Sequence, residues 1–236
     1  MPASYDALAP HFAAYARSRA PYCDAVDRVI LSRLRSRGGA LLDVGSGDGG
    51  RAVRLAKAAF MTRLVLSDPS QGMVAQCRQH QESEVWRTAA EELPASPSSF
   101  DVVTCLWNVL GSVDGTERRV VALKRMRTLL APEGRMFVDV HNRYNARTSG
   151  PTRVWARMIR DRLWSSEVNG SVTFTWSVAG ERIPSRGYLF TAGEMRRLFI
   201  LSGLRVINRC FIDYRTGDLR GCWGGQMLFE LAKDRG

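Results

Sequence analysis

The feature that most constrains the fold is an apolar run that leads into an acidic, glycine-rich turn. Residues 41–50 read Leu-Leu-Asp-Val-Gly-Ser-Gly-Asp-Gly-Gly. Gly45, Gly47 and Gly49 lack a Cβ atom and tolerate positive φ angles, so the backbone can turn sharply from a strand into a helix and approach a ligand closely. An ordinary surface loop is the alternative for so short a motif. We interpret the run as a strand, a ligand-binding turn and a helix over residues 50–59.

A second apolar run, Leu64 to Leu66, ends in Ser67 and Asp68. In a doubly wound sheet the ligand lies across the carboxyl ends of the strands, and an acid about 20 residues past the glycine turn accepts hydrogen bonds from ribose hydroxyls. Asp68 is alternatively an N-cap or turn residue before a helix expected over residues 71–80. The spacing favours a ribose-binding function.

These two motifs begin a series of five that resembles, in order, the class I S-adenosylmethionine (SAM)-dependent methyltransferases. Residues 43–49 resemble the family's first motif, and residues 67–70, with Met73, resemble the second. Residues 89–94 stand where the family passes its backbone beside the adenine. Residues 100–106 resemble the fourth strand, whose end lies under the methionine part of the cofactor, and residues 129–138 resemble the turn into strand five.

The resemblance covers most of the chain and implies that SAM is the cofactor. It also implies that Asp43 binds near the sulfonium end, through water or the cofactor amine. Many relatives place Asp or Asn just after the third strand to accept from the adenine amine, whereas this chain has Thr88, Ala89 and Ala90. A backbone amide can still meet the base edge, and we rank Ala90 above Glu91 for that contact. The residues expected to bind the cofactor are Asp43, Gly45, Ser46, Gly47, Asp68, Pro69, Met73, Ala90, Glu91, Leu106, Tyr5 and Tyr15.

The alternation of short apolar strands and amphipathic helices predicts an α/β fold. Parallel strands are expected near residues 40–44, 63–67, 84–88, 101–105 and 135–140, with helices on both faces. Two further strand-like runs, 204–213 and 225–232, resemble the family's antiparallel edge pair. The expected fold is therefore a Rossmann-like, doubly wound, seven-stranded sheet within a single SAM-binding domain over residues 1–236.

Two segments are expected to cover this sheet. Residues 1–37 form an N-terminal helical cap, in which Tyr5 and Tyr15 are the candidates to contact the cofactor; packing within the helices is the alternative. Residues 142–189 form a cap or lid insertion after strand five, with a basic amphipathic helix over 154–164 and a β segment over 172–176. Five aromatic residues line an apolar pocket or pack the insertion itself: Trp155, Trp164, Phe174, Trp176 and Tyr188.

A dense polar run, residues 139–145, directly follows strand five. Methyl transfer needs a nucleophile aligned about 3 Å from the methyl carbon, so positioning groups supply much of the rate and a strong base is optional. His141 is expected to take a proton from a hydroxyl or amine, although a structural hydrogen bond is the usual function of a lone histidine. Asn142 and Tyr144 are expected to position the acceptor, and Arg143 to hold an acceptor carboxylate.

Composition limits the classes of partner and cofactor that this protein is expected to bind. The 236 residues are 45% hydrophobic, but no apolar stretch approaches the roughly 20 residues that are needed to span a bilayer. The N-terminal residues also lack the pattern of a secretory signal. We therefore expect no membrane partner and a cytoplasmic protein. Five scattered cysteines and three histidines give no metal-binding spacing, so no metal is expected. The formal net charge of +11 is arginine-rich and spread over several helices, which favours a solvated surface over nucleic-acid binding. The oligomeric state is not indicated.

These features predict a SAM-dependent methyltransferase that acts on a small biosynthetic acceptor. Three alternatives remain. One is a cyclase resembling azetidine-2-carboxylate synthases, in which the cofactor amine attacks its own aminobutyl chain and releases methylthioadenosine, because a fold does not fix its chemistry. Another is an RNA methyltransferase, although residues 107–110 do not match the Asn-Pro-Pro-Tyr type loop of base-amino methylases. The last is a catalytically silent subunit, which would be expected to lose part of the cofactor motif.

Overall fold

The computed structural model describes residues 2–34, 38–94, 100–164, 166–178 and 180–234. Its centre is an eight-stranded sheet with the strand order β3-β2-β1-β4-β5-β10-β8-β9. The strands are β1 (Ala40–Val44), β2 (Arg63–Ser67), β3 (Glu84–Trp86), β4 (Phe100–Cys105), β5 (Leu130–Val140), β8 (Leu204–Ile212), β9 (Leu219–Arg220) and β10 (Gln226–Lys233). The first five strands are parallel, and β10 runs antiparallel to both β5 and β8.

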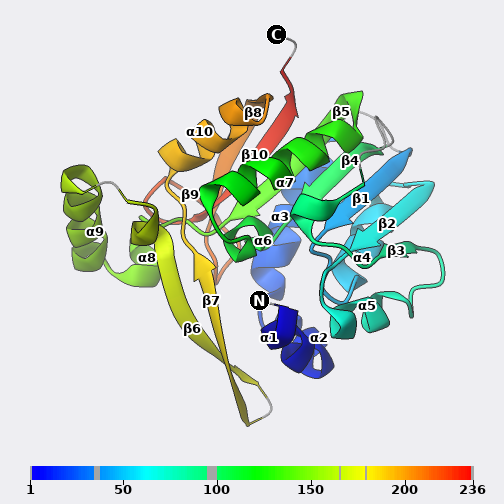
Figure 1. Ribbon diagram of the computed structural model, residues 1–236, viewed down its shortest axis with the longest axis horizontal. Helices are drawn as coiled ribbons and strands as arrows, with labels where there is room; N and C mark the ends of the chain where they lie inside the picture. The colour runs from blue at the N-terminus through cyan, green and yellow to red at the C-terminus, as the bar shows by residue number, and fades with distance from the viewer. Residues whose placement is uncertain (1, 35–37, 95–99, 165, 179, 235–236) are drawn as a thin grey trace.

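Helices cover both faces of this sheet, as Figure 1 shows. One core joins α7 (Thr116–Leu129) and α10 (Ala192–Leu201) to sheet residues such as Val103 and Val138. The other joins α3 (Ala20–Arg33) and α4 (Gly50–Ala58) to residues of the opposite face, among them Phe137. Val138 and Phe137 are neighbours on β5, and their side chains enter different cores because successive residues of a strand point to opposite faces. The doubly wound architecture is therefore confirmed.

The sheet has eight strands, and the prediction of seven was wrong by one. The extra strand, β9, has only two residues and pairs Leu219 and Arg220 with the end of β8. A two-residue strand carries no period-2 pattern, so the sequence offers no signal for it. Strand β5 also begins at Leu130, ahead of the predicted start at residue 135. The pairing of β5 with β4 shifts register between Phe100 and Val102.

The remaining elements lie outside the eight-stranded sheet. They are α1 (Pro2–Leu8), η1 (Ala9–His11), α2 (Phe12–Arg17), α5 (Gln71–Cys77), η2 (Ala90–Glu92), α6 (Val109–Ser112), α8 (Ala146–Ser149), α9 (Pro151–Leu163), η3 (Glu167–Gly170), β6 (Ser171–Val178) and β7 (Glu181–Tyr188). Strands β6 and β7 form a separate antiparallel hairpin, whereas the sequence analysis predicted only its first strand. Of the segments predicted as caps, residues 1, 35–37, 165 and 179 lie outside the described residues.

None of the helices within the described ranges combines the length and the apolar character that crossing a bilayer requires.

Candidate functional site

The glycine turn between β1 and α4 has the conformation that its sequence predicts. Gly45, Gly47 and Gly49 have φ angles of 72°, 59° and 77°, in the left-handed region that favours glycine. A Cβ atom on Gly45 would lie 2.4 Å from Val109 Cγ2, and one on Gly47 would lie 2.6 Å from Phe12 Cζ. The amides of Gly45 and Ser46 donate to the Ser67 carbonyl at 2.7 and 3.0 Å. The turn is thus fixed to the end of β2 by its own backbone.

Asp68 joins the two predicted cofactor motifs. Its Oδ2 accepts from the Gly47 amide at 3.0 Å, and its Oδ1 accepts from the Ser70 amide at 2.9 Å. The side chain is buried, and that burial raises its pKa to about 6. Each carboxylate oxygen has a second lone pair, so Asp68 retains acceptor capacity toward a ligand.

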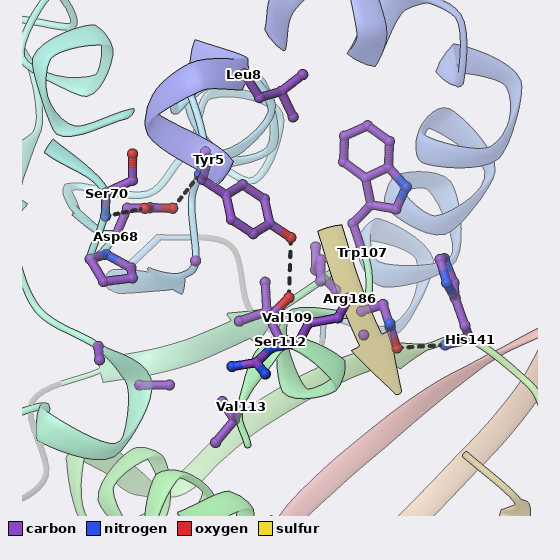
Figure 2. A pocket seen from close by; sticks show the side chains of 18 of the residues that line it. Tyr5, Leu8, Asp68, Ser70, Trp107, Val109, Ser112, Val113, His141 and Arg186 are labelled. Carbon is purple, nitrogen blue, oxygen red and sulfur yellow. Dashed lines mark hydrogen bonds between the residues drawn. The ribbon is translucent and has the colours of Figure 1, made fainter. Parts of the chain in front are cut away.

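A cavity of about 570 Å³ opens at this edge of the sheet, beside the crevice between β1 and β4. Figure 2 shows Asp68 and His141 on opposite sides of it, with Tyr5 and Trp107 between them. Nine of the predicted cofactor residues line this cavity: Tyr5, Tyr15, Gly45, Gly47, Asp68, Pro69, Ala90, Glu91 and Leu106. A crevice at the point where the strand order reverses is where open α/β sheets bind ligands, and the volume suits a small molecule.

Three predicted cofactor residues lie elsewhere. Asp43 and Ser46 line a second cavity of about 450 Å³, which shares Phe12, Gly45, Leu106 and Trp107 with the first. Met73 lines neither cavity and instead packs with Leu8 and Ala9 beneath the N-terminal segment.

The second cavity is polar at its base. The Asp43 carboxylate accepts from Thr104 Oγ1 at 2.5 Å, and burial raises its pKa to about 6. Arg51 faces the same cavity and donates to Asp27, while its buried Nη1 has no partner among the described residues. A carboxylate and an incompletely paired guanidinium suit the ammonium and carboxylate of an amino acid.

The tip of β4 contributes residues that the sequence analysis did not select. Trp107 and Asn108 have positive φ angles of 59° and 64°, which non-glycine residues rarely adopt and which recur at functional sites. The Asn108 side chain accepts from the His141 amide at 2.9 Å and donates to the Tyr188 carbonyl at 3.2 Å. The Trp107 amide donates to buried Asp139 at 3.0 Å. Their position directly after a parallel strand is the signal that could have selected them.

His141 is the one member of the polar run 139–145 that lines the cavity, within the part of the chain that the structure describes. Its ring packs edge-on against Tyr214, with 5.2 Å between ring centroids. Burial, aided by the positive charge of Arg19, lowers the pKa of His141 to about 4. Its buried Nε2 has no hydrogen-bond partner among the described residues. The site therefore contains a neutral imidazole, in which one of the two ring nitrogens carries a proton and the other can accept a hydrogen bond.

Asn142 is a structural residue in this geometry. Its Nδ2 donates to the carbonyls of Cys222 and Gly225 at 2.7 and 3.0 Å, and its Oδ1 accepts from the Tyr144 amide. These bonds consume the amide, which lies outside the set of described residues that line the cavity. Asn142 fixes the chain after β5 to the loop before β10.

Arg143 and Tyr144 are likewise committed to other side chains. Buried Arg143 donates to Asp161 at 2.8 Å and to Glu194 at 2.7 Å, so the expected acceptor carboxylate is replaced by carboxylates of the chain itself. The Tyr144 hydroxyl donates to the same Asp161 at 2.9 Å. Their polar character reflects the attachment of α9, which sequence spacing alone does not distinguish from a binding site.

Aromatic side chains form most of the remaining cavity wall. Tyr15 stacks on Trp107 with centroids 5.3 Å apart, and Tyr5 meets Trp176 edge-on at 5.1 Å. Phe174 also lines the cavity. Tyr188 lies behind the wall, where the Arg119 guanidinium sits 3.9 Å from its ring centroid. Trp155 and Trp164 are each 68% exposed, so the expectation that they pack or line a pocket was wrong.

Comparison with known proteins identifies the chemistry that these motifs serve. Residues 41–134 match a family model described as a methyltransferase domain. The match covers less than half of the 236 residues, and it identifies residues 41–134 as a methyltransferase domain. A search of curated proteins found no match to the sequence. The matched residues run from β1 to the start of β5, and so include the glycine turn, Asp68 and the tip of β4.

Solved structures show how widely this methyltransferase fold recurs. The CcbJ methyltransferase of Streptomyces caelestis matches with a TM-score of 0.67 and 14% identity over 89% of this chain and 90% of that one. A SAM-dependent methyltransferase of Clostridium acetobutylicum matches with a TM-score of 0.65 and 11% identity over 92% of each chain. DesVI of Streptomyces venezuelae matches with a TM-score of 0.65 and 15% identity over 95% of this chain and 98% of that one. At these identities, the likeness is one of fold.

The cavities of this methyltransferase fit SAM, its cofactor. Asp68, which can accept from ribose hydroxyls, and Ala90 line the first cavity, and Asp43 lines the second. Asp43, Asp48 and Asp68 crowd negative charge around that turn, which would repel a pyrophosphate but suits a cofactor that carries a sulfonium and no phosphate. The enzyme is therefore a SAM-dependent transferase.

Proposed function

We propose that this enzyme methylates a small-molecule acceptor held against the aromatic wall of the cavity. The observation that carries the proposal is the composition of the cavity: the cofactor turns form one side, and Tyr15, Trp107, Phe174 and Trp176 line another. Aromatic faces bury large apolar area and also stabilise a nearby cation, whether a sulfonium or an amine. An acceptor with an apolar or aromatic body and a hydroxyl or amine nucleophile fits this lining.

His141 is proposed to orient the nucleophile. When bound, SAM supplies an electrophilic methyl group, so transfer depends mainly on alignment. Neutral Nε2 accepts a hydrogen bond from the acceptor O–H or N–H and directs the nucleophile's lone pair away from the imidazole. With a pKa of about 4, His141 is a weak base, and we favour this orienting function over full proton removal.

The segments before β1 and after β5 are proposed to cover the bound cofactor and acceptor. The Asp6 carboxylate accepts from the Ser70 hydroxyl at 2.6 Å and from the Gly72 amide at 2.9 Å, which attaches α1 to the start of α5. The Tyr5 and Ser112 hydroxyls lie 3.1 Å apart. Figure 2 marks the hydrogen bond between them. Residues 1–37 would thus act as a helical cap, and residues 142–189, through β6, as a lid over the acceptor.

The charges lining the cavity support a small molecule over RNA. Arg118 pairs with Glu91, and Arg186 pairs with Asp114 at 3.2 Å. Each of these arginines has one ion pair with a carboxylate of the enzyme, which offsets the positive charge that would attract a phosphate backbone.

Mass spectrometry of the purified enzyme with SAM tests the proposal, first without an acceptor and then with a panel of aromatic and aliphatic amines and phenols. The expected result is a stable cofactor alone, and adenosylhomocysteine plus a product heavier by one methylene when the acceptor is present. Methylthioadenosine with an equimolar cyclic amino acid, formed without any acceptor, would replace the proposal with the cyclase. Methylation of RNA but of none of the small molecules would also overturn it.

A further inference from the structure

Helix α9 exposes an apolar stripe on its outer side. Trp155, Ile159 and Leu163 stand four residues apart and are 68%, 40% and 61% exposed. Residues at i, i+4 and i+8 lie on one side of a helix, so these side chains form a continuous row. We call this row the α9 ridge. Trp164, just past the helix end, extends its exposed apolar surface.

The opposite side of α9 faces the body of the enzyme. Val154 is the one buried residue of the helix, and Asp161 is held by Arg143 and Tyr144. By contrast, α7 is also rich in arginine and of similar length, but it buries Ala122, Leu123, Met126 and Leu129 in the core. Figure 1 shows α9 standing at the outer edge of the molecule, away from the sheet.

Arginines border the α9 ridge on both sides. The helix contains four arginines and one aspartate, and the carboxylate of that aspartate is consumed by contacts with the enzyme. On a helical projection, Arg162 flanks the row on one side, while Arg153 and Arg160 flank it on the other. All three are exposed. Long arginine side chains in these positions can lay their stems along apolar surface while the guanidinium groups remain in water.

We propose that the α9 ridge docks the enzyme onto an anionic lipid bilayer, in contrast to the expectation from the sequence that the protein has no membrane partner. A helix with tryptophan and aliphatic side chains on one face, and arginines at its borders, matches an interfacial helix that lies in the plane of the membrane. The formal net charge of +11 adds long-range attraction to an anionic surface. It also disfavours a second copy of the chain as the occupant, because two cationic ridges would repel each other. A convex ridge of this kind suits a deformable surface.

Vesicle sedimentation of the full-length enzyme tests the proposal. The probes are phosphatidylcholine vesicles with and without phosphatidylglycerol, at low and physiological salt. The expected result is binding only to the anionic vesicles. The combined substitution Trp155→Ser, Ile159→Ser and Leu163→Ser should weaken that binding by about tenfold or more, because insertion of the apolar row is lost. Arg153→Gln and Arg162→Gln should each weaken it by about fivefold.

Matched substitutions of exposed apolar residues elsewhere, Ile200→Ser with Leu219→Ser, should leave binding unchanged. Measurements of thermal unfolding and SAM affinity check that each variant folds. If the triple serine variant does not fold, vesicle binding by the two arginine variants tests the proposal. Equal binding by the α9 and control variants would show that net charge alone attracts the vesicles and would overturn the proposal. The proposal would also be overturned if the wild-type enzyme did not bind the anionic vesicles. It would be overturned as well if analytical ultracentrifugation showed wild-type dimers that the α9 substitutions dissociate.

Discussion

The two walls of the cavity are built in different ways. The cofactor wall is held by backbone: the amides of Gly45, Ser46 and Gly47 bond to Ser67 and Asp68 across adjacent strands. The aromatic wall, which we propose holds the acceptor, is built from side chains of distant segments, such as the stacked pair Tyr15 and Trp107. Backbone geometry requires particular residues at fixed spacing, whereas an apolar wall accepts many combinations. The first wall therefore leaves a motif in the sequence, and the second does not.

The largest effect is expected on the cofactor wall. Gly45→Ala places a Cβ atom 2.4 Å from Val109 in a left-handed conformation, and we expect loss of measurable SAM binding in calorimetry. Gly150→Ala is the matched control, because Gly150 has a φ of 84° with open space around it and does not line the cavity. Equal SAM affinity in the two variants would show that the space beside Gly45 does not determine cofactor binding.

The second-largest effect is expected from substitution of His141, and it distinguishes acceptor positioning from cofactor binding. His141→Ala is expected to lower kcat on the order of 100-fold, because the acceptor loses its orientation, while SAM affinity stays unchanged. His141→Gln retains an acceptor oxygen and should recover part of the rate. His11→Gln controls for loss of a histidine outside the cavity. A parallel fall in SAM affinity would move His141 to the cofactor wall.

Asp68 should give a smaller effect with a defined pH dependence. Asp68→Asn is expected to weaken SAM binding about tenfold, because hydrogen bonds to a charged acceptor are lost. In the wild-type enzyme the pKa of Asp68 is raised to about 6, so SAM affinity should fall as the pH drops through 6 and the carboxylate becomes protonated. Calorimetry between pH 5 and pH 8 measures both effects, and the variant should lose part of the dependence. Asp114→Asn, an exposed carboxylate at the same cavity, should behave as wild type.

The smallest effect concerns a residue beside the site that does not enter it. Asn142→Ala leaves the carbonyls of Cys222 and Gly225 without a donor and should lower the free energy of unfolding by about 1–3 kcal/mol. Denaturant titration measures this change. SAM affinity should remain unchanged, whereas a loss of turnover without a loss of stability would restore Asn142 as a positioning group.

The order of the parallel strands and the cofactor wall could be predicted from sequence. Strands β1 and β2 have the predicted bounds because each apolar run is short and ends at a glycine turn or an acid. The helix after the glycine turn ends within one residue of the prediction, at Ala58. Strands β7 and β9 were missed: β7 contains Pro184 and Gly187, which weaken a strand pattern, and β9 exists only through its pairing with β8.

The sequence by itself determined the methyltransferase motifs, the turn between the first strand and its helix, and the acid that joins the first two strands, because these depend on local backbone geometry. Only the tertiary structure decided which polar residues after β5 face the cavity. His141, Asn142 and Tyr144 are close neighbours in sequence, yet one lines the cavity while the others bond to segments far along the chain. It also decided that Trp155 lies outside on the α9 ridge while Trp176 lies inside. The direction of a side chain depends on the packing of distant elements, and a single sequence does not record that packing.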